Sequence, residues 1–233
     1  MLLPAREAVI SALVELAAGD PARAMEVLAV PKTQPELVAL NASLRSAPTA
    51  KASEIYTGVV YDALSAATLS PAAKRRLGRQ VMVTSSVFGL VGMGDRIPSY
   101  RLSGDTSLPG LPGGGGVQAH WRAHLEPAVL EAVGSGLLVD LRSGTYASFW
   151  APTPIAARTA TVRVLHEIGG VRKVVSHFNK ATKGRIVRAL LEAGAAPRTP
   201  AALATALRDL GWSVEEGPAT KKGVQLDVVV REL

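Results

Sequence analysis

The spacing of hydrophobic and polar positions changes near residue 80, from a helical period to a strand period. Before that point apolar residues recur every three to four positions, and Asp20 and Thr33 stand where N-caps are expected. The predicted helices are Ala5–Ala18, Pro21–Leu28, Pro35–Arg45, Thr57–Ser65 and Ser70–Arg79, with a loop over Ser46–Ser53. Residues 1–80 are therefore expected to be mainly helical.

After residue 80, short runs of β-branched and aromatic residues alternate with helical patterns. The predicted strands are Val81–Thr84, Leu137–Leu141, Tyr146–Phe149, Thr161–Leu165, Arg172–Ser176, Trp212–Glu215 and Val224–Arg231. The helices predicted between them are Val117–Val133, Lys180–Ala193 and Pro200–Leu210. This mixture predicts an α+β fold with a single mixed β-sheet flanked by helices, whose last two strands form a hairpin through Pro218–Gly223. We expect one domain over 1–233, helical over 1–80 and mixed over 81–233.

Composition narrows the possible partners. The chain has 233 residues and is 48% hydrophobic, which is enough to form a hydrophobic core. It contains no cysteine, and this excludes disulfides, thiolate catalysis and cysteine-bound metals. No apolar run is long enough for a membrane span, and the start MLLPAREAVI lacks the pattern of a signal peptide, so we expect a cytoplasmic protein with no membrane partner. The net charge of +7 favours nucleic acid or phosphorylated small molecules as partners.

The most informative stretch runs from Val171 to Arg188 and contains no acid. Its six cations are Arg172, Lys173, Lys180, Lys183, Arg185 and Arg188. With Asn179 as the predicted N-cap, Lys180 and Lys183 fall in the first helical turn, where the partial positive charge of the helix dipole opposes them, and Glu192 is unfavourable at the other end. Such an arrangement is reasonable if an anion, most simply a phosphate, binds there. The alternative is a face of solvated charges.

The candidate phosphate site is built on this helix start. Lys180, Lys183 and Arg185 provide the charge, since guanidinium groups make planar two-point contacts and ammonium groups act as mobile point charges. Asn179 and Gly184 would permit close approach of the backbone. Two further cations, Arg101 and Arg142, are expected to join from other loops.

Other polar and aromatic residues form a candidate pocket. Tyr56 and Tyr100 could stack on bases or donate hydrogen bonds, although each is also a typical buried core residue, and Thr57 adjoins Tyr56. Asp140 ends an apolar strand beside Arg142, which suits a general base or a metal-binding carboxylate. The pattern favours the alternative, a structural ion pair between Asp140 and an arginine.

Several catalytic motifs are absent from the sequence. His120 and His124 are four residues apart but lack the Glu of a His-Glu-x-x-His site, so we expect no metal and no cofactor. Ser85-Ser86 lacks the nucleophile elbow of a serine hydrolase. The glycine-rich segment from Pro109 to Gly116 is not followed by Lys-Ser/Thr and is predicted to be a surface loop.

Six sequence motifs, taken together and in this order, resemble those of the YaaA-like peroxide stress proteins. The chain resembles the actinobacterial members of that family. The motifs are Ile55-Tyr-Thr-Gly-Val-Val-Tyr-Asp62, Ser85-Ser-Val-Phe-Gly-Leu90, Asp95-Arg-Ile-Pro-Ser-Tyr-Arg-Leu102, Ala119-His-Trp121, Val139-Asp-Leu-Arg-Ser-Gly-Thr-Tyr146 and Ser176-His-Phe-Asn-Lys-Ala-Thr-Lys-Gly-Arg185. The resemblance implies a cytosolic protein that limits iron-linked damage during peroxide stress, with DNA binding as its activity. It also implies a basic cleft and a helix-hairpin-helix element within Asp20–Arg45, where the pattern alone favours two packed core helices, since the connector lacks the usual glycines.

The chain departs from this family in two ways. The family's usual N-terminal strand is missing, which predicts either a misassigned start or a sheet that lacks a strand. Gly92-Met93 and Gly104-Asp105 replace the family's Arg-Pro and Met-Gly. Two function classes remain open: a DNA-binding stress protein, or an enzyme that acts on a nucleotide or phosphorylated small molecule.

Overall fold

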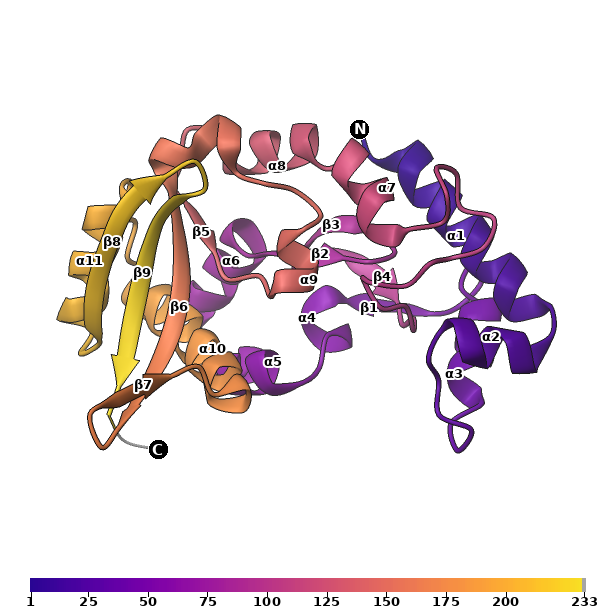
Figure 1. The fold of residues 1–233 in the computed structure, drawn as a ribbon, viewed down its shortest axis with the longest axis horizontal. Helices are drawn as coiled ribbons and strands as arrows, with labels where there is room; N and C mark the ends of the chain where they lie inside the picture. Colours follow the sequence, from indigo (N-terminus) through magenta and orange to yellow (C-terminus); the bar gives the residue numbers. More distant parts are fainter. Residues whose placement is uncertain (232–233) are drawn as a thin grey trace. The chain divides into compact units, whose positions relative to one another are not determined.

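The computed structural model describes residues 1–231, and the chain divides into two compact units (Figure 1). Unit 1 comprises residues 1–55, 82–132 and 142–150, and unit 2 comprises residues 56–81, 133–141 and 151 onward. Helices and strands are mixed in both units, which confirms the predicted α+β class. The prediction of one domain divided at residue 80 stays a prediction.

Unit 1 is mainly helical and carries two small hairpin-like sheets. Its elements are α1 (Leu3–Ala18), α2 (Pro21–Val27), α3 (Glu36–Ala42), β1 (Thr49–Lys51), α4 (Ala52–Ile55), β2 (Met82–Ser85), β3 (Gly89–Gly92), β4 (Arg96–Pro98), α7 (Val117–His124), α8 (Glu126–Val133) and α9 (Gly144–Ala147). β1 pairs with β4 and β2 pairs with β3, both antiparallel. Trp121 is fully buried and donates from Nε1 to the Ser86 carbonyl (2.7 Å), which fixes α7 on the β2–β3 turn.

Unit 2 contains the main sheet. Its elements are α5 (Val59–Leu64), η1 (Ala66–Thr68), α6 (Pro71–Gln80), β5 (Leu138–Asp140), η2 (Thr153–Arg158), β6 (Thr159–Ile168), β7 (Val171–Lys173), α10 (Ser176–Ala193), α11 (Pro200–Asp209), β8 (Ser213–Thr220) and β9 (Gly223–Val230). The strand order is β5-β6-β9-β8, and β7 pairs with β6. β6 runs parallel to β5 and β9, whereas β7 and β8 are antiparallel additions.

The core of unit 2 lies between one face of this sheet and two helices. Alternate residues of β6, including Val162 and Val164, pack with Leu226 of β9, Ile186 of α10 and Leu203 of α11. Figure 1 shows α10 and α11 beside the sheet. The predicted hairpin of the last two strands is confirmed as β8 and β9. The sheet therefore places the start of α10 near the carboxyl ends of β6 and β9.

Three local predictions were wrong. The predicted strand at Tyr146–Phe149 is instead the short helix α9 and its exit. The predicted helix Val117–Val133 is divided into α7 and α8 at Leu125, because Pro127 has no N–H and crowds the carbonyl one turn earlier. The predicted loop Ser46–Ser53 contains β1 and the start of α4.

Candidate functional site

Three of the six cations between Val171 and Arg188 have structural partners. Arg172 donates to Glu167 and Glu215 (2.8 Å each), which raises the pKa of Arg172. Arg188 donates to the Leu64 and Ser65 carbonyls (3.0 Å each) and so holds the end of α5. The third is Lys183, whose Nζ donates to the Leu141 carbonyl (3.1 Å). Much of the cluster is therefore explained by packing within unit 2.

The other three cations are exposed. Lys173 on β7 and Lys180 and Arg185 on α10 form no salt bridge within the described part of the chain. Their side chains lie at the surface, where an anionic partner can reach them. These are the cations of the predicted cluster that the fold leaves for binding.

The predicted helix start at Asn179 was wrong. α10 begins at Ser176 with Val175 as its N-cap, and the Asn179 N–H already bonds to the Val175 carbonyl (2.8 Å). Lys180 and Lys183 therefore lie beyond the first turn, where the dipole effect has faded. At the other end, Glu192 accepts from the Ser70 N–H (3.0 Å), a contact that lowers the pKa of Glu192 and explains its position.

Gly184 allows two helices, α10 and α5, to come close together. A Cβ atom at Gly184 would lie 2.2 Å from the Val60 carbonyl oxygen and 2.9 Å from the Ala63 Cβ. The close backbone approach expected at this glycine is therefore made to α5. Its predicted contact with phosphate stays a prediction.

Lys183 and Asp140 lie near each other at the end of β5. Burial lowers the pKa of Lys183, and the charge of Asp140 opposes this shift in part. The strand end expected for Asp140 is present, since β5 ends there. A half-buried ammonium beside a carboxylate can hold a phosphate or move a proton, and it can also simply tie α10 to β5.

We expect the Lys183→Met variant to change the pH dependence of stability. Because the pKa of Lys183 is lowered in the folded chain, the unfolded chain binds more protons between that lowered value and 10.5. The free energy of unfolding of the wild type should therefore rise relative to that of the variant as the pH approaches 10.5. Urea unfolding from neutral to alkaline pH measures this difference, and a difference independent of pH would contradict the burial of the ammonium.

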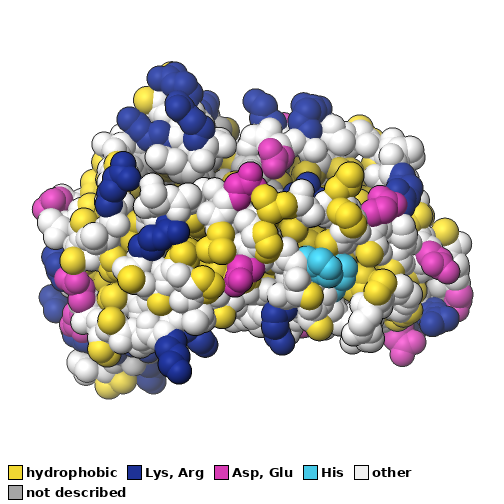
Figure 2. Space-filling view, turned by 90° about the horizontal axis from the view of Figure 1, so that it is seen from above, with side chains coloured by type: hydrophobic (Ala, Val, Ile, Leu, Met, Phe, Trp, Pro, Cys, Tyr) yellow, Lys and Arg dark blue, Asp and Glu magenta, His cyan; other side chains and the backbone are white. Residues whose placement is uncertain are grey.

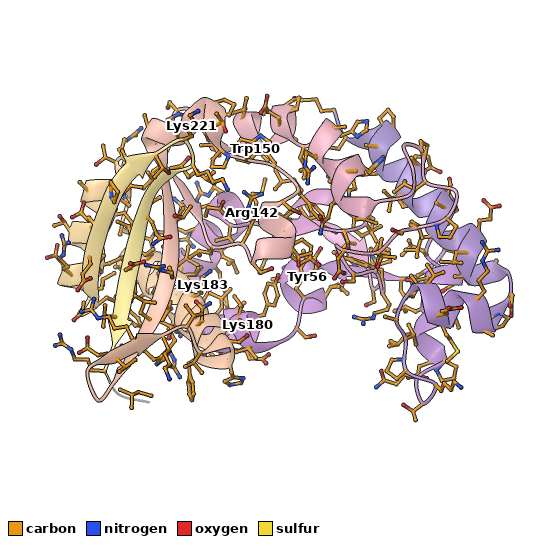
Figure 3. The ribbon with its side chains drawn as sticks, in the orientation of Figure 1. Tyr56, Arg142, Trp150, Lys180, Lys183 and Lys221 are labelled. Carbon is orange, nitrogen blue, oxygen red and sulfur yellow. The ribbon has the colours of Figure 1, made fainter. Side chains whose placement is uncertain are left out.

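Two tyrosines stack beside this region of unit 2. The rings of Tyr56 and Tyr61 are 5.5 Å apart and inclined by 18°. Tyr61 lies on α5, which packs along α10, and Thr57 is exposed just before that helix. Figure 3 shows Tyr56 ahead of α5 and Lys180 and Lys183 on α10. The structure therefore brings an aromatic pair to the helix layer that carries the predicted lysines.

The remaining predicted residues lie in unit 1. Arg142 donates to the carbonyls of Tyr146 (3.3 Å) and Trp150 (3.0 Å), and its guanidinium lies 5.7 Å from the Trp150 ring centroid (Figure 3). Tyr100 shares a hydrogen bond with Ser85 (2.8 Å). That Arg101, Arg142 and Tyr100 join the cations of α10 stays a prediction.

A buried asparagine missed by the sequence analysis holds Arg101. Asn41 on α3 donates from Nδ2 to the Arg101 carbonyl (2.7 Å) and accepts the Arg101 N–H at Oδ1 (2.8 Å). Tyr146 lies nearby, and burial raises the pKa of its phenol. The sequence offers no local signal for this contact, since sixty positions separate the two residues.

A second cationic helix was also missed, although its signal resembles that of α10. α6 contains four cations and no acid; Arg76 donates to the Leu191 carbonyl (2.8 Å), whereas Lys74, Arg75 and Arg79 are exposed. Figure 2 shows one face of the molecule, where Lys and Arg side chains (dark blue) stand in separate groups among hydrophobic (yellow) and acidic (magenta) ones. On this face, the positive charge is distributed in patches.

The histidines and the first helices have structural contacts. His120 bonds through Nε2 to the Ala5 carbonyl (3.0 Å), and within residues 1–231 no three His, Cys, Asp or Glu side chains gather as metal ligands.

α2 and α3 both pack on α1. A helix-hairpin-helix role for them stays a prediction. No helix in the described residues has the length and apolar character to cross a membrane.

Comparisons with known proteins agree with the sequence resemblance. The family profile described as Peroxide stress protein YaaA matches residues 2–217. A UPF0246 protein of Streptomyces coelicolor is 54% identical over 235 residues, covering 100% of this chain and 88% of its own length. A UPF0246 protein of Corynebacterium efficiens is 43% identical over 230 residues, covering 97% of this chain and 88% of its own length.

Proposed function

The chain belongs to the peroxide stress protein YaaA family, and from this membership we propose that it binds DNA through its phosphates and limits iron-linked oxidative damage in the cytoplasm. The observation that carries the proposal is the set of exposed cations Lys173, Lys180 and Arg185 on β7 and α10, which form no salt bridge among residues 1–231. Arg172 on β7, by contrast, is paired with Glu167 and Glu215. The three exposed cations, on a chain of net charge +7, suit a polyanion.

The surroundings of these cations support binding with little sequence preference. Contacts from Lys and Arg to phosphates position a protein on DNA without reading the bases. The stacked pair Tyr56 and Tyr61 offers flat apolar surface, which accepts any base. The cations of α6 extend the charge of unit 2. Separately, the connector between α2 and α3 in unit 1 is proposed to contact phosphate through its backbone as a helix-hairpin-helix.

We expect a Lys180→Gln/Arg185→Gln double variant to weaken binding to duplex DNA uniformly across sequences. Each lost phosphate contact should reduce the slope of log affinity against log salt by roughly 0.9. Fluorescence anisotropy over a salt series measures both quantities. The matched control is Lys221→Gln/Lys222→Gln, which removes the same charge from the exposed β8–β9 turn. Equal losses in the two variants would show that only net charge matters, and a salt-independent affinity of the wild type would refute phosphate binding.

A second candidate function rests on the Lys183–Asp140 pair. A lysine whose pKa is lowered by burial, beside a carboxylate, marks a candidate functional site, and its ammonium group suits a phosphorylated small molecule. Calorimetric titration with nucleotides would test it. Binding that is lost in Lys183→Met and kept in Lys180→Gln/Arg185→Gln would favour this function over DNA binding.

A further inference from the structure

His166 is a buried histidine for which the fold provides no hydrogen-bond partner. It lies near the end of β6, opposite Lys173 of β7 and Val230 of β9, and is only 2% exposed. Neither ring nitrogen has a partner within the described residues. A histidine ring always carries at least one N–H donor, and buried donors are nearly always satisfied. The packing of unit 2 therefore does not explain why this N–H donor is buried.

The His166 ring packs against a residue in the first turn of α10. Its centroid is 5.3 Å from that of Phe178, the third residue of the helix. No side chain caps this eighteen-residue helix, whose first turn contains no acid. The N–H groups of its first residues, Ser176, His177 and Phe178, have no carbonyl within the helix to bond. The ring of a buried histidine without a hydrogen-bond partner in the described residues thus contacts the first turn of a helix that no side chain caps.

Two lysines border the same place. Lys173 pairs directly with His166 across antiparallel strands, so both side chains point to the same face of the sheet. Lys180 lies one turn into α10, and long helical side chains lean back toward the helix N-terminus. Both lysines are exposed. The start of α10 is therefore bordered by positive charge, which is the chemistry of a phosphate site.

We propose that the start of α10, with His166 packed against it, binds a terminal phosphate of a nucleic-acid strand; this rests on the proposed function above. The donors gathered here are backbone N–H groups, an imidazole and two ammonium groups, and such a set suits the three free oxygens of a phosphate monoester. A phosphate inside a strand has only two. Asn179 in the same turn has a buried Oδ1 without a partner in the described chain, and a monoester, with its second pKa near 6, still carries an O–H in part to donate to it.

The test compares short duplexes of one sequence that end in phosphate or in hydroxyl groups, by fluorescence anisotropy. The wild type should bind the phosphate-ended duplex about tenfold more tightly, equivalent to about 1.4 kcal/mol. His166→Phe keeps an aromatic ring against Phe178 and removes the donor. It should abolish the preference and leave the affinity for the hydroxyl-ended duplex unchanged. His166→Asn, which retains an N–H donor, should keep part of the preference.

Inorganic phosphate tests the site independently of DNA. Its addition should shift the amide NMR signals of Ser176, His177 and Phe178 in the wild type and not in His166→Phe. DNA binding without an end preference and without these shifts would overturn the inference and leave the proposed function standing. Shifts with phosphate but no binding of either duplex would uphold the anion site and refute the proposed function. Because the wild type alone gives both readouts, instability of a variant does not prevent a decision.

Discussion

Gly184→Ala is expected to lower the free energy of unfolding by about 3 kcal/mol, at the upper end of the usual cost of overpacking. The new Cβ would lie 2.2 Å from the Val60 carbonyl oxygen, an atom of the backbone that cannot rotate away. α5 and α10 would have to separate, and the contacts of Arg188 with the end of α5 would loosen. Urea unfolding measures the loss, and hydrogen exchange of the α5 and α10 amides locates it.

Gly78→Ala is the matched control for this prediction. Gly78 also lies inside a helix, α6, but a Cβ there would meet no atom within 4 Å. Alanine should therefore stabilise the chain by roughly 0.5–1 kcal/mol through its better helix propensity. If both substitutions stabilise the chain, α5 and α10 do not cross as closely at Gly184 as the structure shows.

The same crossing shows why the role of Gly184 could not be predicted. The sequence shows a glycine within a cationic helix, and such a glycine can make room either for a bound phosphate or for a neighbouring helix. The sequence does not reveal the neighbouring helix, because α5 lies more than a hundred positions earlier in the chain. In the same way the stretch 171–188 contains no acid, yet Glu167 and Glu215 reach Arg172 from β6 and β8. Strand pairing supplies the counter-charges that a local pattern cannot show.

Elements with a long, consistent period were predictable, and short ones were not. The core strands β6 and β9 and the helices α1, α6 and α11 agree with their predictions in type and place. Tyr146 and Phe149 are three residues apart, a spacing that places them on one face of a helix and on opposite faces of a strand. In the structure their rings lie 5.3 Å apart around α9. A segment of four residues contains too little of either period to decide.

The start of α10 shows how packing overrides a local cap. Asn179 is a better N-cap by type than Val175, yet the helix begins before it because Phe178 packs against His166 as part of the first turn. The unpaired nitrogens of His166 are also a property of the fold alone. The sequence could therefore identify the cationic helix as the place to look, and only the structure could show which of its groups remain available.

Asn41→Ala is expected to lower the free energy of unfolding by about 3 kcal/mol. Asn41 is fully buried, and its amide bonds to both the N–H and the carbonyl of Arg101. Alanine would leave both backbone groups without a partner, at roughly 1–3 kcal/mol for each unsatisfied group. Ser43→Ala, which removes an exposed hydroxyl from the end of the same helix, is the control and should change stability by less than about 0.5 kcal/mol.

Tyr146 gives this variant a second readout, which a general loss of stability would not produce. Burial holds the pKa of the Tyr146 phenol above 10.0, and the segment around Arg101 contributes to its surroundings. If Asn41 fixes that segment, Asn41→Ala should admit water and move the pKa of Tyr146 back toward 10.0 while the chain is still folded. Ultraviolet titration of the phenols, referenced to a Tyr146→Phe variant, measures the shift. An unchanged titration together with a full loss of stability would mean that Asn41 supports α3 rather than the position of Arg101.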